Sequence, residues 1–313
     1  MARNPIQFQA GLSLPAFLEQ YGSQDQCKRA IFDLRWPHGF SCPECTNKTA
    51  CLLARGTFQC HRCHHQCSLT AATICHATKL PLRTWFLAIY LLTQRKKSLS
   101  ALQLGRELGV SYNTAWKLKH KVMQVMLERN AGEALVGRIE IDDAYLGGER
   151  SGKRGRGADH KVPFVAAVQT SPEGHPLQIQ LRRVPAFSAS SPKAYADHSV
   201  HPGSHVVSDG LACFNVFDRK PWTHEPIITG GGRNSAQTPA FKWVNTMLGN
   251  VKNAITATFH SVSQAHAPRY LAEFEYRFNR RYDLGSMIER FAYVALRTPP
   301  MPYRLLRMAE KYG

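Results

Sequence analysis

Two short apolar runs in this chain each end in an aspartate. Asp142 closes the sequence IEID, and Asp209 closes the sequence VVSD. Asn245 follows 36 positions after Asp209, in a helical stretch that also carries Lys252. A strand fixes the backbone, so a carboxylate at its end projects to where a divalent cation can bind beside a phosphodiester. If the two aspartates converge, the sequence predicts metal-dependent phosphoryl transfer on DNA.

The elements that position these aspartates follow from the hydrophobic pattern. We predict strands at 138–146, 162–170 and 177–184, a helix around 192–196 and a strand at 205–209. Three strands, a helix and another strand are typical of an RNase H-like α/β sheet, in which the first and fourth strands lie side by side. Asp142 and Asp209 are then expected to be neighbours, although 66 residues separate them.

A glycine- and arginine-rich segment, 147–157, connects the first two predicted strands. It is too flexible and too charged to pack, so we predict a hairpin tip that grips a DNA backbone through charge-assisted contacts. The alternative is a merely solvated loop. The predicted DNA contacts in this segment are Lys153, Arg154 and Arg156.

The bulk composition favours a nucleic-acid partner. The 313 residues carry 40 basic and 22 acidic side chains, a net charge of +18, which points to a polyanion. No apolar stretch approaches the length of a membrane span, and the first residues lack the layout of a signal peptide. We therefore expect a cytoplasmic protein without a membrane partner, whose nine cysteines are metal ligands or reduced core residues.

Four cysteines have the spacing of a structural zinc site. Cys42 and Cys45 form one CxxC knuckle, and Cys60 and Cys63 form a second one 14 residues later. Two facing knuckles complete a tetrahedral Zn²⁺ site with no open position, so the site is expected to be structural. Fortuitous cysteines are the alternative. Three further cysteines near the knuckles, Cys51, Cys67 and Cys75, do not fit this pattern and are predicted to be core thiols.

A helix-turn-helix segment is predicted after the ribbon. A first helix at 80–92 precedes two short helices that meet at 109–111, where Ser111 can cap the second. The alternative is a helical hairpin that only packs between two domains. Polar residues of the second helix could face a DNA groove or its phosphates: Tyr112, Asn113, Lys117, Lys119, His120 and Lys121. Among them, Asn113, Lys117 and Lys121 are the predicted DNA contacts.

Composition and pattern divide the chain into five parts. We predict an N-terminal helical segment (1–36), a zinc ribbon (37–76), a helix-turn-helix region (77–132), an RNase H-like catalytic core (133–295) and a C-terminal tail (296–313).

Several blocks of this sequence resemble the DDE transposases of bacterial insertion sequences. The similar group carries an N-terminal zinc ribbon, and its active site consists of two aspartates, an asparagine or glutamate, and a lysine. The matching blocks are IEIDDAYLGG at 139–148, VSDG at 207–210, WVNTMLGNVK at 243–252, TFH at 258–260 and RYLAEFEYRFNRR at 269–281. They occur in the expected order, and the resemblance runs from the ribbon to about residue 290.

The resemblance implies that Asp142, Asp209 and Asn245 are the equivalents of the acidic triad, and that Lys252 is the accompanying lysine. Lys252 lies seven residues, or close to two helical turns, beyond Asn245, so the two share a helical face. Lys252 is then placed to hold a phosphate or a terminal base. Asn250 faces another side of the helix and is the rival third ligand.

The implied chemistry uses Mg²⁺ or Mn²⁺. Two carboxylates can hold a pair of such ions about 4 Å apart on a phosphodiester. An asparagine in place of the commoner glutamate offers an amide oxygen but no charge, so we expect weaker metal affinity. Glu140, Asp143 or the DNA phosphates are candidates to supply the missing charge.

Three arginines near the end of the predicted core form a basic patch that we predict to contact DNA. They are Arg277, Arg280 and Arg281. Charge on a solvated helix surface is the alternative interpretation.

The resemblance implies a transposase that binds the terminal inverted repeats of its element, cleaves there and joins the 3′ ends to target DNA. Bringing two ends together implies a dimer or larger assembly on double-stranded DNA. An RNase H-like nuclease without strand transfer would need no end-specific DNA-binding module. A zinc-ribbon regulator would leave Asp142 and Asp209 without a role.

Overall fold

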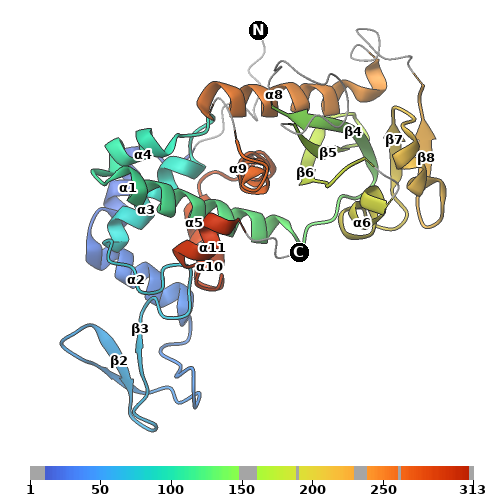
Figure 1. Ribbon diagram of the computed structural model, residues 1–313. Coiled ribbons are helices and arrows are strands. Elements are labelled where there is room, and N and C mark those ends of the chain that lie inside the picture. The colour runs from blue at the N-terminus through green and yellow to red at the C-terminus, as the bar shows by residue number, and fades with distance from the viewer. Residues whose placement is uncertain (1–10, 148–160, 188–189, 229–237, 260–261, 310–313) are drawn as a thin grey trace. The chain divides into compact units, whose positions relative to one another are not determined.

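The computed structural model describes residues 11–147, 161–187, 190–228, 238–259 and 262–309 (Figure 1). The chain forms two compact units. The first consists of Met1–Val125 and Arg281–Gly313, and the second of Met126–Arg280. Lys153, Arg154 and Arg156 lie outside the described residues.

The first unit contains a small antiparallel sheet with the order β1-β2-β3. Its strands are β1 (Ala50–Leu52), β2 (Thr57–Cys60) and β3 (Gln66–Ser68). Gly56 has a φ of 82°, which lets the chain reverse tightly between β1 and β2. Phe58 of β2 packs among Phe32, Trp36 and Phe40, with ring centroids 5.2–5.8 Å away. So few apolar side chains form a core that is small for independent stability.

Helices make up the rest of the first unit. They are α1 (Leu14–Tyr21), α2 (Gln24–Arg35), α3 (Leu82–Thr93), α4 (Ala101–Leu108), α5 (Tyr112–Asn130), α10 (Met287–Ala295) and α11 (Tyr303–Met308); α5 continues into the second unit. The Ser23 hydroxyl and the Gln26 side chain form a reciprocal capping box that starts α2.

The predicted turn between two helices is present between α4 and α5. Gly109 ends α4 with a φ of 65°, a left-handed conformation that costs glycine little. The Ser111 hydroxyl accepts the backbone N–H of Thr114 at 3.3 Å, as expected for a helix cap. Leu104 and Ala115 are fully buried, so the two helices share an apolar face.

The second unit is built on a five-stranded sheet with the order β6-β5-β4-β7-β8. The strands are β4 (Arg138–Leu146), β5 (Val162–Thr170), β6 (Pro176–Arg183), β7 (His205–Ser208) and β8 (Thr223–Pro226). β4 pairs antiparallel with β5 and parallel with β7. This arrangement confirms the predicted RNase H-like sheet with adjacent first and fourth strands. The fifth strand, β8, was not predicted because its sequence, THEP, has no apolar alternation.

Helices cover both faces of this sheet (Figure 1). The helix α8 (Lys242–Phe259) follows the short turn η2 (Pro239–Phe241), and with α9 (Ala267–Asn279) it packs on one face. The helix α6 (Ser190–Ser199) and the 3-10 turn η1 (Ala212–Asp218) lie on the other face. Ile139 and Ile141 of β4 belong to the α6 side, whereas Ala144 belongs to the α8 side. Alternation along the strand therefore directs Asp142 to the α8 side.

Among the helices in the described ranges, none is long and apolar enough to cross a membrane.

Candidate active site

The two sequence-predicted aspartates come together on adjacent strands, with Asp142 in the middle of β4 and Asp209 directly after β7. In the parallel pairing of β4 and β7, Arg138 lies opposite His205 and Glu140 opposite Val207. The same offset, carried two residues further, brings Asp142 opposite Asp209. Carboxylate oxygens of Asp142, Asp143 and Asp209 all lie within 4.8 Å of one another. Three hard oxygen donors at this spacing suit a divalent cation such as Mg²⁺ or Mn²⁺.

Backbone contacts fix the two carboxylates. The N–H of Asp143 donates to Asp142 Oδ1 at 2.8 Å, and the N–H of Leu211 donates to Asp209 Oδ1 at 3.0 Å. Between these residues Gly210 adopts a φ of 78°, and a Cβ there would come within 3.1 Å of Ile228 Cγ1. The glycine after Asp209 is therefore required by the turn that presents the carboxylate.

A chain of side-chain hydrogen bonds supports the same turn from the opposite face. Ser208 Oγ lies 2.8 Å from His224 Nε2, and His224 Nδ1 lies 2.6 Å from Asp218 Oδ1. The N–H of Gly210 also donates to Ser208 Oγ at 3.2 Å. These contacts tie η1 and β8 to the residue that precedes Asp209.

The electrostatic environment of Asp142 disfavours its charged form. Burial, together with the nearby charges of Asp143 and Asp209, raises the pKa of Asp142 from 3.8 to about 7, against the opposing effects of the Asp143 N–H and the Lys252 ammonium. A strongly raised carboxyl pKa in a cluster of acids is common at functional sites, and a bound cation would offset the repulsion.

The helix α8 carries the remaining predicted site residues. Asn245 is half-buried in its first turns, while Lys252 is exposed two turns later. Lys252 lies close enough to Asp142 for its charge to lower the pKa of that carboxyl. Asn250, the rival ligand, is exposed.

Glu140 does not supply charge to the acid cluster. It is 2% exposed, Arg138 donates to its Oε1, and the backbone N–H groups of Trp243 and Val244 donate to its Oε2. Because both oxygens already accept hydrogen bonds within the fold, that part of the sequence-based hypothesis is wrong. Asp143 is the acid that lies beside Asp142 and Asp209.

The four predicted zinc ligands converge in the first unit. Sulfur atoms of Cys42, Cys45, Cys60 and Cys63 all lie within 4.8 Å of one another, and two pairs across the knuckles are 3.6 Å apart. Zn–S bonds of about 2.3 Å in a tetrahedron separate the sulfurs by about 3.8 Å, so the cluster fits Zn²⁺. Burial raises the pKa of Cys60, but the N–H groups of Cys63 and Arg62 and the Asn47 amide outweigh it and lower the pKa to about 6.

Of the three cysteines predicted to be core thiols, one is not buried. Cys67 and Cys75 are buried, as predicted for core thiols, whereas Cys51 is exposed on β1. The small sheet has too little depth to bury both of its faces.

The polar residues of α5 divide into exposed and buried groups. Asn113 and Lys117 are exposed, and Lys117 Nζ lies 4.6 Å from the Tyr303 ring centroid. Lys121 donates to the carbonyl of Ile74 at 3.2 Å, and burial lowers its pKa. The predicted DNA contact at Lys121 is therefore wrong.

Two neighbours of Lys121 were also expected to face DNA and do not. Lys119 and His120 are each only 1% exposed, and Lys119 donates to the Leu99 carbonyl. Because Leu118, Lys119 and His120 are consecutive and all buried, this part of α5 is covered on more than one side.

The predicted arginine patch does not form. Arg277 is 8% exposed and pairs with buried Glu273 at 2.6 Å. Arg280 pairs with Glu133 at 3.1 Å and lies 4.0 Å from the Tyr276 ring centroid. Arg281 is half-buried, 4.1 Å from the Tyr282 ring centroid. Arg277 and Arg280 thus hold the fold together, which corrects both the DNA-contact prediction and its surface-charge alternative.

Sequence reasoning missed the chain of His224 and Asp218 entirely. Nothing in the spacing of these residues distinguishes them from other polar side chains, because Ser208, Asp218 and His224 meet only through the pairing of β7 with β8. The adjacent acids Asp142 and Asp143 were a usable signal, since they are consecutive on one predicted strand.

Comparisons with known proteins match both units. Residues 134–279 match the family model of the ISXO2-like transposase domain, and residues 22–66 match that of the transposase zinc-ribbon domain. A relative from Halobacterium salinarum, described as an uncharacterized protein in transposable element ISH50, is 24% identical over 276 residues, which is 76% of this chain and 89% of the relative. These matches agree with the resemblance found in the sequence.

We expect Asp142→Asn to stabilise the metal-free protein. Because the pKa of Asp142 is raised in the folded protein, ionisation of its carboxyl lowers the free energy of unfolding. This loss begins as the pH rises from 3.8 and is complete above about pH 7. The loss is on the order of 2–4 kcal/mol. In EDTA the melting temperature of the variant should therefore exceed that of the wild type by several degrees at pH 8, and by less at pH 5.

Asp197→Asn, at an exposed position of α6, is the matched control and should show no pH-dependent gain. Equal melting temperatures for wild type and Asp142→Asn at both pH values would contradict the electrostatic interpretation of the cluster.

We expect Cys45→Ser to release zinc and Cys51→Ser to retain it. The first variant removes one of four convergent thiolates, whereas the second removes an exposed thiol outside the cluster. Zinc content after dialysis, measured with a colorimetric chelator, should be about one ion per chain for wild type and Cys51→Ser. Equal zinc loss in both variants would show that the four-cysteine cluster is not the site.

Proposed function

Since the chain belongs to the insertion-sequence transposases that combine a zinc ribbon with an ISXO2-like domain, we propose that it binds the terminal inverted repeats of its element, cleaves there and joins the 3′-hydroxyl ends to target DNA. The observation that supports the reaction is the cluster of carboxylates from Asp142, Asp143 and Asp209, just beyond the paired residues of β4 and β7. Such a cluster suits metal-assisted displacement at phosphorus.

The proposed roles follow from donor chemistry. Asp142 and Asp209 bind Mg²⁺ or Mn²⁺, and Asn245 adds an amide oxygen from α8. When bound there, a pair of these ions would supply activation of water or a 3′-hydroxyl and stabilisation of the departing oxygen. Lys252, exposed and near Asp142, holds a DNA phosphate. Asp143 supplies the additional negative charge that asparagine lacks.

DNA recognition is assigned to the helices α4 and α5 and to the overall charge. Asn113 and Lys117 are exposed on α5, at the start of the second helix of the pair. In this proposal they contact a groove or its phosphates, and Lys153, Arg154 and Arg156 contact the DNA backbone. The net charge of +18 favours binding to both element ends and target. The protein acts in the cytoplasm as a dimer or larger assembly on DNA.

A strand-transfer assay tests the proposed reaction. Purified protein, Mn²⁺ or Mg²⁺ and a duplex with the terminal repeat should yield products joined to a target plasmid. Asp142→Ala and Asp209→Ala should each reduce joining by at least about a thousandfold, because two-metal chemistry requires both carboxylates, while DNA binding in a gel-shift assay stays within about twofold of wild type.

The product distinguishes the alternatives. Hydrolysis without joining would identify a nuclease, and binding without cleavage a regulator. Joining at wild-type rates by either alanine variant would refute the proposed site.

The identity of the third ligand can be tested by adding charge to α8. Asn245→Asp should lower the Mg²⁺ concentration for half-maximal joining by several-fold, since a carboxylate binds a hard cation better than an amide. Asn250→Asp is the matched control on the same helix, at an exposed position, and should leave this concentration unchanged. A shift with Asn250→Asp alone would assign the ligand to Asn250.

A further inference from the structure

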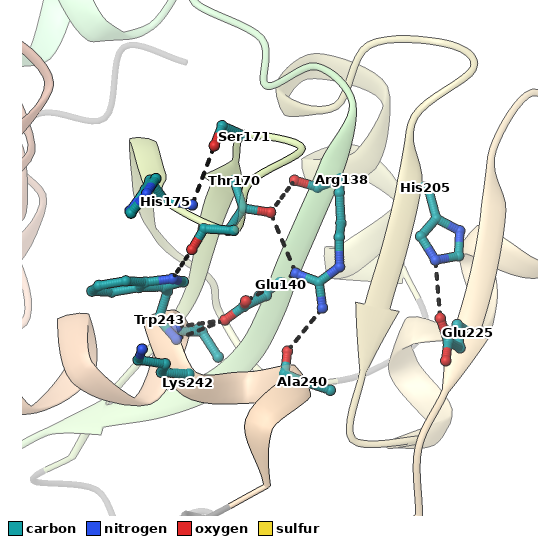
Figure 2. Close-up of polar contacts among 12 residues, drawn as sticks. Arg138, Glu140, Thr170, Ser171, His175, His205, Glu225, Ala240, Lys242 and Trp243 are labelled. Atoms are coloured by element: carbon teal, nitrogen blue, oxygen red, sulfur yellow. Dashed lines mark hydrogen bonds and ion pairs between the residues drawn. The ribbon is translucent and has the colours of Figure 1, made fainter.

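The first turn of α8 is held by a side chain of the sheet. Glu140 Oε2 accepts the backbone N–H groups of Trp243 at 2.8 Å and Val244 at 3.0 Å (Figure 2). The first N–H groups of a helix have no acceptor within the helix. Phe241, which precedes α8, has no acceptor in its side chain. The Glu140 carboxylate, 103 positions away from Trp243 along the chain, therefore caps α8 in place of a neighbouring side chain.

Arg138 extends this contact to the preceding turn. Its guanidinium donates to Glu140 Oε1 at 2.9 Å and to the carbonyl of Ala240, in η2, at 3.2 Å (Figure 2). Arg138 and Glu140 thus form a two-residue clamp on the start of α8. Glu140 is 2% exposed, so water competes little with its hydrogen bonds, which are stronger for being charge-assisted.

The clamp lies between two proposed metal ligands. Arg138, Glu140 and Asp142 occupy alternate positions of β4, and they share the face toward α8. Asp142 is two residues beyond Glu140, about 7 Å along the strand. Asn245 directly follows Val244, whose N–H the clamp holds. The contact therefore joins the strand of the first ligand to the helix of the third.

We propose that Glu140 is a positioning residue that fixes Asn245 relative to Asp142 for metal binding. This inference rests on the proposed function of the acid cluster. An amide oxygen has no net charge with which to attract a cation across a gap, so its position has to be set in advance by the fold. Glu140 provides that position through the reach of its side chain and not through its charge at the metal.

Three substitutions distinguish the effect of the length of the Glu140 side chain from the effect of its charge. Glu140→Gln keeps the length of the side chain and a carbonyl oxygen for the helix, but loses the charge. Glu140→Asp keeps the charge but is one methylene too short to hold the two N–H groups. Glu140→Ala removes both. Thr170→Val is the matched control, because Thr170 is also buried and its hydroxyl is bonded to Arg138, whereas the N–H groups of α8 are bonded to Glu140.

The experiment measures Mn²⁺ binding by calorimetry on the full-length protein without DNA, alongside its melting temperature and its joining activity. We expect Glu140→Asp and Glu140→Ala to weaken Mn²⁺ binding about tenfold or more, the usual effect of losing a residue that orients a ligand. The Mn²⁺ affinity of Glu140→Gln should remain within about threefold of the wild-type value, and that of Thr170→Val should equal the wild-type value.

Two results would overturn the inference. If Glu140→Gln binds Mn²⁺ weakly and Glu140→Asp binds it normally, Glu140 acts through its charge. If all three variants keep wild-type affinity and only melt earlier, Glu140 is merely structural. A wild type that binds Mn²⁺ but never joins DNA would instead count against the proposed function, and the order of affinities would still decide the role of Glu140.

Discussion

The parallel pairing of β4 with β7 is the constraint on which the candidate site depends. Its register brings Asp142 opposite Asp209, although 66 residues separate them along the chain. The pairing is stabilised by burial of Ile139, Ile141 and Val206, which pack under α6 and η1. A slip by one residue would turn every side chain of β7 to the opposite face and separate the carboxylates. Apolar packing on the α6 side of the sheet therefore fixes the position of the carboxylates on the α8 side.

The cysteine cluster and the carboxylate cluster differ in the amount of apolar core that surrounds them. The four sulfur atoms around Cys60 converge beside a small sheet that has little apolar core, so a Zn²⁺ ion bound there would contribute to the stability of the fold. The carboxylates around Asp142 come from β4 and from the residue after β7, in a unit with large apolar clusters on both faces of its sheet. Burial of apolar side chains therefore stabilises the fold that holds these three acids close together.

Much of the fold was predictable because its signals are local. The knuckle spacing of the cysteines, the apolar runs ending in Asp142 and Asp209, and the turn at Gly109 each depend on a few neighbouring residues. β8 and the clamp at Glu140 were not predictable, since each depends on a partner distant in sequence. The arginine patch failed for a related reason. Arg277 is paired one helical turn back with Glu273 and packed inside, and a charge pattern alone does not reveal which face of α9 is buried.

Ser208, His224 and Asp218 have a further consequence. Their types, order of contact and spacing are those of a hydrolase triad, in which a histidine links a nucleophilic serine to an acid. Here the serine is fully buried, and its oxygen also accepts the N–H of Gly210. No acyl compound can reach that hydroxyl. The three side chains therefore have the geometry of an esterase site, but they only support the turn beside Asp209. Solvent access, and not the identity of the three side chains, separates a nucleophile from a structural support.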